Sequence, residues 1–497
     1  MMKIRNFIPR EYQEKIFETT KRKNTLVVLP TGLGKTACAI MLAVERLNKY
    51  PDSKILVCSP TKPLCDQHTK SFKENTDINE NEIVLFTGAT LPKKREELWK
   101  DKKIIIATPQ TIESDIKNKR ISLENFSMLC IDECHRSKLK FANTIVAKNY
   151  IEISKYPLIL ALTASPGSTK EGIDEICKNL YIEAVEIRTA QDEDVKPYVK
   201  EKEVNWVEVD LPEEFNKISI LLKNIYNTKA KELKNFGLSK PSNLINKRDL
   251  LFLQKQLQKE IEKKNNYAFY GISLVASIIK LNHCIELLET QGLNSFKDYI
   301  NKLRNETSKA AKSLLNDKNF IEAIKLSNNL SLEHPKIERL RREVEKHLKE
   351  NEKSRIIIFA NYRNMVKELI SVLNKIPGAK PIELVGQKEG LTQKEQIKRI
   401  EDFSSGVYNI LIGTSISEEG LNISSADHAI FYEPTPSEIR DIQRRGRVGR
   451  LTNGKVTILI TKNTRDQAYY WVAKRKEQKM KKTLYKMQED QASLKTW

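Results

Sequence analysis

The sequence predicts an α/β protein in which two parallel β-sheets are separated by a helical domain. Apolar runs of strand length alternate with helical stretches over residues 54–162, and the same alternation resumes at residue 354. Such alternation is typical of doubly wound parallel sheets, whose functional residues follow the carboxyl ends of the strands. Between the two regions, residues 212–350 are rich in Lys, Glu, Asn and Leu at helical spacing.

These patterns predict four segments. They are a first lobe at residues 1–203, a helical insertion at residues 204–350, a second lobe at residues 351–463, and a C-terminal helix and tail at residues 464–497. Residues 204–209 have the apolar character of a strand, which we expect to be the last one before the helical region. A chain of 497 residues is too long for a single hydrophobic core, which agrees with several domains.

The composition predicts a soluble protein with a polyanionic partner. The formal net charge is +21, which favours nucleic acid, and a generally Lys-rich composition is the alternative explanation. No apolar run approaches the roughly 18 residues of a membrane span, and residues 1–10 lack a signal-peptide core. We therefore expect a cytoplasmic location and no membrane partner. The seven cysteines include no C-x-x-C pair, so neither a zinc site nor a disulfide framework is expected.

The stretch LVVLPTGLGKT, residues 26–36, has the pattern of a phosphate-binding loop. A strand pattern precedes the glycine-rich turn and a helical pattern follows it, so the turn opens into a helix N-terminus. Lys35 is expected to reach the β- and γ-phosphates, and the Thr36 hydroxyl to ligate Mg²⁺. The general pattern has Gly where this chain has Leu29. The predicted nucleotide-binding residues are Pro30, Thr31, Gly32, Leu33, Gly34, Lys35 and Thr36.

Two carboxylates follow another predicted strand, at residues 127–131. Asp132 is expected to hold Mg²⁺, Glu133 to polarise the attacking water as general base, and His135 to couple the site to a neighbouring strand. An acidic pair after a strand is ordinarily a solvated turn, but the P-loop in the same sheet favours the catalytic interpretation. Further upstream, the Gln13 amide could present a donor and an acceptor to an adenine edge.

Residues suited to phosphodiester contacts follow two more strands, where capping of the next helix is the alternative role. These candidates are Pro60, Thr61, Lys62, Thr108, Pro109 and Gln110. The second half of the sequence has no further P-loop, but it has the run Q-R-R-G-R-V-G-R at residues 443–450. Its arginines Arg447 and Arg450, flanked by glycines, are suited to stabilise charge on a transferring γ-phosphate. A charged helix end is the alternative.

In order and spacing, these motifs resemble those of the superfamily 2 helicases. The matching set is R-x-x-Q at residue 10, P-T-G-L-G-K-T, P-T-K at 60, T-P-Q at 108, D-E-C-H, T-A-S at 163, I-I-I-F-A-N-Y-R at 356, T-S-I-S-E-E-G-L-N at 414, and the arginine run. Within that superfamily the chain resembles the archaeal Hef and FANCM branch, because H-C-I-E-L-L-E-T-Q-G at 283 looks like the signature of that branch's inserted domain. The resemblance covers the helicase part of these proteins and not the nuclease of archaeal members.

The resemblance implies two RecA-like lobes with ATP and Mg²⁺ between them, and a thumb-like insertion that engages branched DNA. It implies Lys35, Thr36, Asp132 and Glu133 on one side of the nucleotide, Gln443, Arg447 and Arg450 on the other, and Arg10 and Gln13 on the adenine. Gly420 is implied as a further nucleotide contact, and Asn361, Arg363, Thr414 and Ser415 as nucleic-acid contacts.

The predicted function is an ATP-dependent DNA helicase or translocase acting on branched DNA, such as stalled forks and recombination intermediates, in DNA repair. The alternatives are an RNA-directed ATPase of the RIG-I and Dicer type, and a non-catalytic nucleic-acid clamp gated by ATP. Near the C-terminus, Gln491, Leu494 and Trp497 resemble a peptide that binds replication sliding clamps, for which a chance pattern is the alternative.

Overall fold

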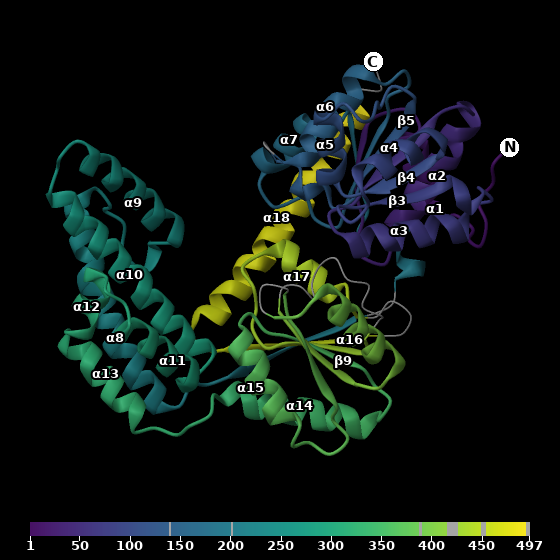
Figure 1. The fold of residues 1–497 in the computed structure, drawn as a ribbon. Helices are drawn as coiled ribbons and strands as arrows, with labels where there is room; N and C mark the ends of the chain where they lie inside the picture. Colours follow the sequence, from purple (N-terminus) through teal and green to yellow (C-terminus); the bar gives the residue numbers. More distant parts are fainter. Residues whose placement is uncertain (139–140, 200–201, 387–389, 415–425, 449–453, 494–497) are drawn as a thin grey trace.

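The structure is a computed structural model, and it describes the chain except for residues 139–140, 200–201, 387–389, 415–425, 449–453 and 494–497. Figure 1 shows two sheet-containing lobes, a helical arm beside the second lobe, and one long helix that runs from the second lobe onto the first. The two lobes are the predicted parallel α/β units, and the arm is the predicted helical insertion.

The first lobe is built on a seven-stranded parallel sheet in the order β3-β4-β2-β5-β6-β1-β7. Its strands are β1 (Thr25–Val28), β2 (Lys54–Cys58), β3 (Ile83–Phe86), β4 (Ile104–Ala107), β5 (Phe126–Ile131), β6 (Ile159–Thr163) and β7 (Ala184–Ile187). Its helices are α1 (Glu11–Thr20), α2 (Lys35–Lys49), α3 (Lys62–Asn75), α4 (Pro92–Asp101), α5 (Pro109–Lys117), α6 (Ala142–Ile153) and α7 (Lys170–Asn179). Central strands such as β4 and β5 are buried along their whole length, as expected where helices cover both faces of a sheet.

The second lobe has a six-stranded parallel sheet in the order β10-β11-β9-β12-β13-β8. Its strands are β8 (Lys202–Val209), β9 (Ile356–Phe359), β10 (Pro381–Leu384), β11 (Ile410–Gly413), β12 (His428–Phe431) and β13 (Gly454–Thr461). Its helices are α14 (Pro335–Glu350), α15 (Arg363–Leu373), α16 (Gln393–Ser405) and α17 (Glu438–Arg445).

Strand β8 belongs to the second sheet rather than to the insertion. All eight of its residues pair in parallel with β13, from Lys202 beside Gly454 to Val209 beside Thr461. A strand at residues 204–209 was therefore predicted correctly, but its placement in a segment outside the second lobe is wrong. An apolar run identifies a strand without identifying the strand beside which it pairs.

Helix α14 also belongs to the second lobe, although the sequence predicts it as the end of the insertion. Its residues Ile337, Leu340 and Val344 pack in one core cluster with Ile356 and Ile358 of β9. The predicted boundary at residues 350/351 is therefore wrong, and the arm ends before α14 begins. Helical periodicity shows which face of a helix is buried, but not which core it joins.

The helical arm consists of α8 (Glu213–Glu232), α9 (Lys247–Glu262), α10 (Tyr267–Thr290), α11 (Leu293–Arg304), α12 (Lys309–Leu315) and α13 (Lys318–Asn328). Helix α10 is at its centre, in contact with α8, α9, α11 and α12. By length and hydropathy α10 has the properties of a membrane span, and 56% of its most apolar window is buried inside the structure. Burial of that extent is what the central helix of a bundle requires.

The last helix, α18 (Arg465–Ser493), connects the two lobes. Its residues Met480 and Leu484 are buried in a core cluster of the first lobe. Further along, the side-chain oxygens of Gln488 and Gln491 accept the backbone N–H groups of Ile187 and Val185, each at 2.8 Å. Because β7 is an edge strand, these glutamines satisfy donors that no neighbouring strand pairs.

The contact of Gln491 bears on the predicted sliding-clamp peptide. The sequence predicts a C-terminal helix and tail, and in the structure α18 continues to Ser493 and binds Gln491 to the edge of the first sheet. In this arrangement the side-chain oxygen of Gln491 already accepts a hydrogen bond from the Val185 backbone. Leu494 and Trp497 lie outside the described residues, so the clamp peptide stays a prediction that the structure does not support.

A buried ion pair joins α14 to the start of α18. The ammonium of Lys336 lies 2.8 Å from a carboxylate oxygen of Asp466, and both side chains are almost completely buried. The same ammonium donates to the Tyr432 carbonyl at 3.1 Å. Asp466 also accepts from the backbone N–H and the hydroxyl of Thr461. This network connects α14, β12, β13 and α18.

Replacing Lys336 with Met is expected to lower the free energy of unfolding of the second lobe by about 3–5 kcal/mol, because Asp466 is left as an uncompensated buried charge. Urea denaturation followed by circular dichroism measures this loss. The double variant Lys336→Met/Asp466→Leu is expected to recover much of it. The control is Asp210→Ala, which removes an exposed pair with Lys462 and should cost less than about 1 kcal/mol. Equal losses in Lys336→Met and the control would contradict the prediction.

Candidate active site

The P-loop has the local geometry that its sequence predicts. Gly32 and Gly34 have φ angles of 87° and 73°, in the left-handed region that favours glycine. The chain then enters α2 at Lys35, whose ammonium donates to the Leu29 carbonyl at 3.1 Å. The loop therefore leads from the end of a buried strand into a helix N-terminus, where backbone donors and the helix dipole favour an anion.

Gln13 holds the P-loop from the side of α1. It is only 3% exposed, its carbonyl oxygen accepts from the Arg10 backbone at 2.9 Å, and its amide donates to the Leu33 carbonyl at 3.4 Å. A Cβ atom added at Gly34 would lie 2.4 Å from the same amide nitrogen. The structure thus places Gln13 against the loop, and the contact with adenine stays a prediction.

The two predicted carboxylates follow β5 at the same edge of the sheet. Asp132 is 7% exposed, and one of its oxygens accepts from His68 Nε2 at 2.9 Å. Burial alone would raise the pKa of Asp132, but the hydrogen bond and charge of His68 and the nearby Lys35 hold it below its ordinary value. Asp132 is therefore an ionised carboxylate, as a Mg²⁺ ligand must be.

Glu133 has an unusual backbone conformation. Its φ angle is 50°, a left-handed value that is uncommon for any residue other than glycine. Residues held in this region cluster at active sites, where the surrounding structure enforces them. Glu133 lines the same cavity as Asp132 and the P-loop, which is the position that a general base for an attacking water requires.

His135 contacts the neighbouring strand, as the sequence predicts. Its Nδ1 lies 3.2 Å from the hydroxyl of Thr163 at the end of β6, and 3.3 Å from a carboxylate oxygen of Glu133. The T-A-S segment is thereby connected to the carboxylate pair through a single imidazole.

His68 is a site residue that the sequence analysis missed. It lies on α3, far from Asp132 in the sequence, and only the folded sheet brings the two together. One signal was present: His68 shares the buried face of α3 with Cys65 and Phe72, which are spaced at i−3 and i+4. A polar residue among apolar ones on the inner face of a helix needs a buried hydrogen-bond partner.

The second lobe closes the site through α17 and the residues that follow it. A cavity of about 290 Å³ is lined on one side by P-loop residues, Asp132 and Glu133, and on the other by Gln443 and Arg447. Two of the predicted nucleic-acid contacts, Pro60 and Thr61, also line this cavity. The predicted contacts Arg450 and Gly420 lie outside the described residues.

The Asn361 side chain makes hydrogen bonds within the second lobe. Its side-chain oxygen accepts from Arg444 at 2.9 Å and from Arg440 at 3.2 Å. The Arg444 guanidinium is fully buried, and it stacks against Phe359 and Phe431 with centroid distances of 5.3 and 5.5 Å. The structure therefore gives Asn361 a scaffold role, and the predicted nucleic-acid contact would compete with these bonds.

The remaining predicted nucleic-acid contacts differ in exposure. Lys62, Gln110 and Arg363 are exposed, each within the first turn of a helix, whereas Pro109 and Thr414 are buried. Thr108 stands at the N-cap position of α5 without a capping bond from its side chain, and its hydroxyl pairs with that of Thr111 at 2.8 Å. Ser415 lies outside the described residues. Contact of these residues with nucleic acid stays a prediction.

The two lobes touch where Thr31 meets Gly446. A Cβ atom added at Gly446 would lie 1.8 Å from the Thr31 hydroxyl and 2.7 Å from its Cβ. The Thr31 side chain thus occupies the space that a side chain at residue 446 would need, so the P-loop and the end of α17 are in close contact.

Replacing Gly446 with Ala is expected to push the lobes apart at this point and to lower nucleotide turnover by about a hundredfold, since a misplacement of about 1 Å has effects of that size. Gly446 has a φ of −72°, so alanine introduces no backbone strain. Steady-state turnover and a thermal melt measure the two effects. The matched control is Gly88→Ala, at an exposed position that is open to a Cβ and is not among the glycines with a left-handed φ. A Gly446→Ala variant with normal turnover would show that the contact is not required.

Three family models match consecutive parts of the chain. "DEAD/DEAH box helicase" matches residues 10–172, "Putative ATP-dependent RNA helicase, helical bundle" matches residues 214–333, and "Helicase conserved C-terminal domain" matches residues 335–452. The end of the helical-bundle match at residue 333 and the start of the C-terminal-domain match at residue 335 agree with the observed end of the arm and start of α14.

Similar proteins match nearly the whole chain. A Methanocaldococcus jannaschii protein named "Putative ATP-dependent RNA helicase" is 42% identical over 98% of this chain and 62% of its own length. The ATP-dependent DNA helicase mph1 of Neurospora crassa is 32% identical over 93% of this chain and 41% of its own length. The chain thus spans less than two thirds of these relatives.

A solved structure matches almost end to end. The crystal structure of the Pyrococcus furiosus Hef helicase domain is 43% identical, with a TM-score of 0.73, and the match covers 93% of this chain and 98% of that domain. An Arabidopsis thaliana protein named DEAD-box ATP-dependent RNA helicase FANCM is 32% identical over 93% of this chain and 35% of its own length. The chain belongs to the Hef and FANCM branch of the superfamily 2 helicases, of which it carries the helicase part.

Proposed function

We propose that this helicase hydrolyses ATP to move along DNA and that it acts on branched DNA, such as stalled forks and recombination intermediates. The observation that carries the proposal is the cavity between the lobes, where the P-loop and Asp132 face Gln443 and Arg447. A phosphate-binding loop, an ionised carboxylate and an arginine from a second body are the parts that phosphoryl transfer needs. The DNA-directed names of Mph1-type relatives support the choice of nucleic acid.

The donor set of the cavity fits a bound Mg²⁺. Thr36 and Asp132 would hold the ion, and a metal at this place neutralises charge on the β- and γ-phosphates. Lys35, released from the Leu29 carbonyl, would neutralise the same oxygens from the P-loop. Glu133 would orient and deprotonate the attacking water, while Arg447 stabilises charge from the opposite lobe.

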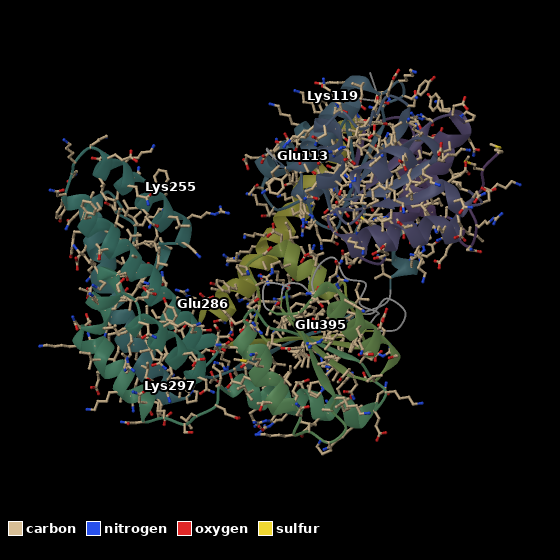
Figure 2. The ribbon with its side chains drawn as sticks, in the orientation of Figure 1. Glu113, Lys119, Lys255, Glu286, Lys297 and Glu395 are labelled. Atoms are coloured by element: carbon tan, nitrogen blue, oxygen red, sulfur yellow. The ribbon has the colours of Figure 1, made fainter. Side chains whose placement is uncertain are left out.

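The exposed face of α9 supports contact between the arm and nucleic acid. Arg248, Phe252, Lys255 and Lys259 follow one another at intervals of four, three and four residues, so they form one stripe along the helix. Phe252 is 64% exposed, and the three cations have no ion pair among the described residues. Lys255 lies near the free end of the arm (Figure 2). Basic and aromatic residues in one stripe suit a nucleic-acid strand.

An RNA-directed ATPase of the RIG-I and Dicer type is the second candidate. It is favoured by one observation, that the helical-bundle model and two of the relatives carry RNA helicase in their names. Turnover measured side by side with forked DNA, linear duplex DNA, single-stranded DNA and duplex RNA at one salt concentration decides between the candidates. Binding affinity alone would not, because phosphate contacts dominate it for both nucleic acids. A non-catalytic clamp would bind ATP without turnover on any of them.

Replacing Glu133 with Gln is expected to lower DNA-stimulated ATP turnover by at least about a hundredfold while ATP binding persists, because only the water-activating carboxylate is lost. Replacing Lys35 with Ala should weaken ATP binding as well. Steady-state hydrolysis and titration with a fluorescent ATP analogue measure the two effects. Near-normal turnover in Glu133→Gln would contradict the assignment of Glu133 as the general base.

Replacing Arg248, Lys255 and Lys259 together with Ala is expected to weaken fork binding and to flatten its salt dependence. Each lost phosphate contact lowers the slope of log K against log[salt] by about 0.9. The control replaces three exposed lysines elsewhere on the arm, Lys309, Lys318 and Lys325, and removes the same charge. Equal slopes in the two triple variants would show that the α9 stripe does not contact DNA.

A further inference from the structure

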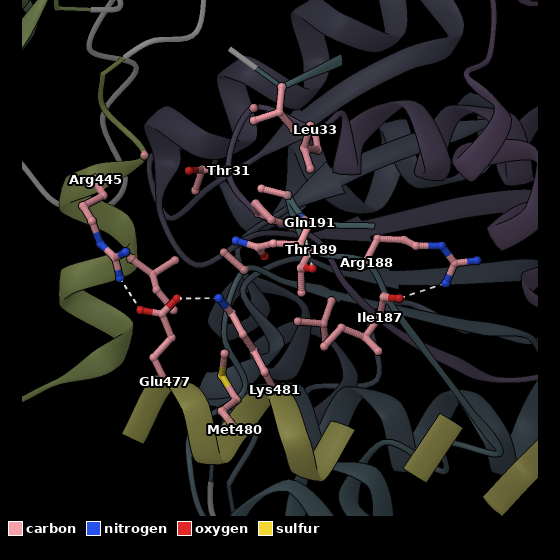
Figure 3. A pocket seen from close by; sticks show the side chains of 18 of the residues that line it. Thr31, Leu33, Ile187, Arg188, Thr189, Gln191, Arg445, Glu477, Met480 and Lys481 are labelled. Carbon is pink, nitrogen blue, oxygen red and sulfur yellow. Dashed lines mark hydrogen bonds and ion pairs between the residues drawn. The ribbon is translucent and has the colours of Figure 1, made fainter. Parts of the chain in front are cut away.

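Residues at the end of α17 and just beyond it face different partners. Gln443 and Arg447 line the phosphate-site cavity, whereas Arg445 lines a second cavity of about 400 Å³ between the lobes, bounded by α18. Figure 3 shows Arg445 reaching across to Glu477 of α18. Arg445 also pairs with Asp441, one turn earlier on its own helix, at 2.7 Å. Arg445 is thus directed away from the phosphates and towards α18.

Glu477 is the centre of the contact between α17 and α18. Its carboxylate pairs with Arg445 and, at 2.8 Å, with Lys481 one turn further along α18. The Glu477 side chain is only 16% exposed. Burial alone would raise its pKa, but Arg445 and Lys481 hold the pKa below its ordinary value. Glu477 is therefore a largely buried carboxylate that stays ionised and is bound from both sides.

One turn beyond Glu477, α18 contacts the other half of the site. The Ser165 hydroxyl donates to the sulfur of the buried Met480 at 3.0 Å. Ser165 in turn exchanges hydrogen bonds with the Thr163 hydroxyl, which contacts His135 beside Glu133. Unbroken contacts therefore lead from the arginine helix of the second lobe, through α18, to the carboxylate that faces the phosphate cavity.

Helix α18 is held at both ends. Its first turn is fixed to the second lobe through Asp466, and its last turns to the first lobe through Gln488 and Gln491. A helix of 29 residues spans about 43 Å at 1.5 Å per residue. Helix α17 contacts α18 between these two ends. The position of that contact along α18 therefore determines the distance between Arg447 and the P-loop.

We propose that Glu477 is a positioning residue for ATP hydrolysis, which acts by holding α17, and with it Arg447, at the separation from the P-loop that turnover requires. The inference rests on the proposed ATP hydrolysis and names a contact that controls it. Glu477 lies outside the phosphate cavity and acts through Arg445, so its removal should change turnover without removing a group that touches ATP.

The test is Glu477→Gln, which keeps the side-chain shape and removes its charge. We expect kcat for DNA-stimulated ATP hydrolysis to fall at least about tenfold, since small displacements of reacting groups have effects of this order. The KM for ATP and the thermal midpoint should change little. The matched control is Glu489→Gln, at an exposed position near the end of the same helix, which should leave kcat unchanged. Arg445→Lys/Glu477→Gln should lose no more than the worse single variant, because both act through one contact.

A second readout does not depend on hydrolysis. Fluorescent labels at Lys100→Cys in the first lobe and Lys394→Cys in the second, both exposed positions, report the separation of the lobes. Glu477→Gln should broaden the distance distribution with and without a non-hydrolysable ATP analogue, and Glu489→Gln should not.

Two outcomes overturn the proposal. One is a Glu477→Gln protein with normal kcat and an unchanged distance distribution. The other is a fall in kcat that comes together with an equal loss of ATP affinity and thermal stability, which would indicate a merely structural role. A wild-type chain that fails to hydrolyse ATP with any nucleic acid would instead refute the proposed function. In that case a broadened distribution in Glu477→Gln would still support the positioning contact.

Discussion

The arrangement of the arm and of α18 on the second lobe depends on the buried ion pair between Lys336 and Asp466. Two desolvated charges are costly, and they are tolerated here because the surrounding backbone satisfies them: Lys336 donates to Tyr432, and Asp466 accepts from Thr461. The pair holds the first turn of α14 against the first turn of α18. It therefore sets both where the arm leaves the second lobe and the direction in which α18 departs towards the first.

The chain joins its two lobes at separate places, and this restricts how they move. It passes from the first lobe into β8, an edge strand of the second sheet, and it returns along α18 to the edge strand β7 of the first. Between these connections the lobes meet where the Thr31 side chain packs against Gly446, which leaves no room for a side chain at residue 446. We therefore expect a change at the phosphate cavity to be transmitted as a rotation of whole lobes about these connections.

The sequence predicts the local parts of this structure well. Strands buried on both faces are continuous apolar runs, as in Ile104–Ala107 and Ile356–Phe359, and the P-loop is defined by glycines whose backbone angles other residues rarely adopt. What the sequence did not predict depends on contacts between distant segments. The sheet that β8 joins, the core that α14 joins, and the partner of His68 are all decided by such contacts. No periodicity within one segment encodes them.

The run from Gln443 to Arg447 shows why charge alone does not identify a catalytic arginine. Successive residues of a helix differ by about 100° in direction, so within α17 Gln443 faces the phosphate cavity while Arg444 and Arg445 point elsewhere. Arg447 follows two residues after the end of the helix and lines the same cavity as Gln443. Arg444 is enclosed between aromatic rings with its donors satisfied, and Arg445 is held by two carboxylates. Reaching a phosphate would require either of them to break these buried bonds, at a cost that the new contact would first have to offset. Among these three arginines, Arg447 is the one that lines the phosphate cavity, while the other two hold the helix that presents it.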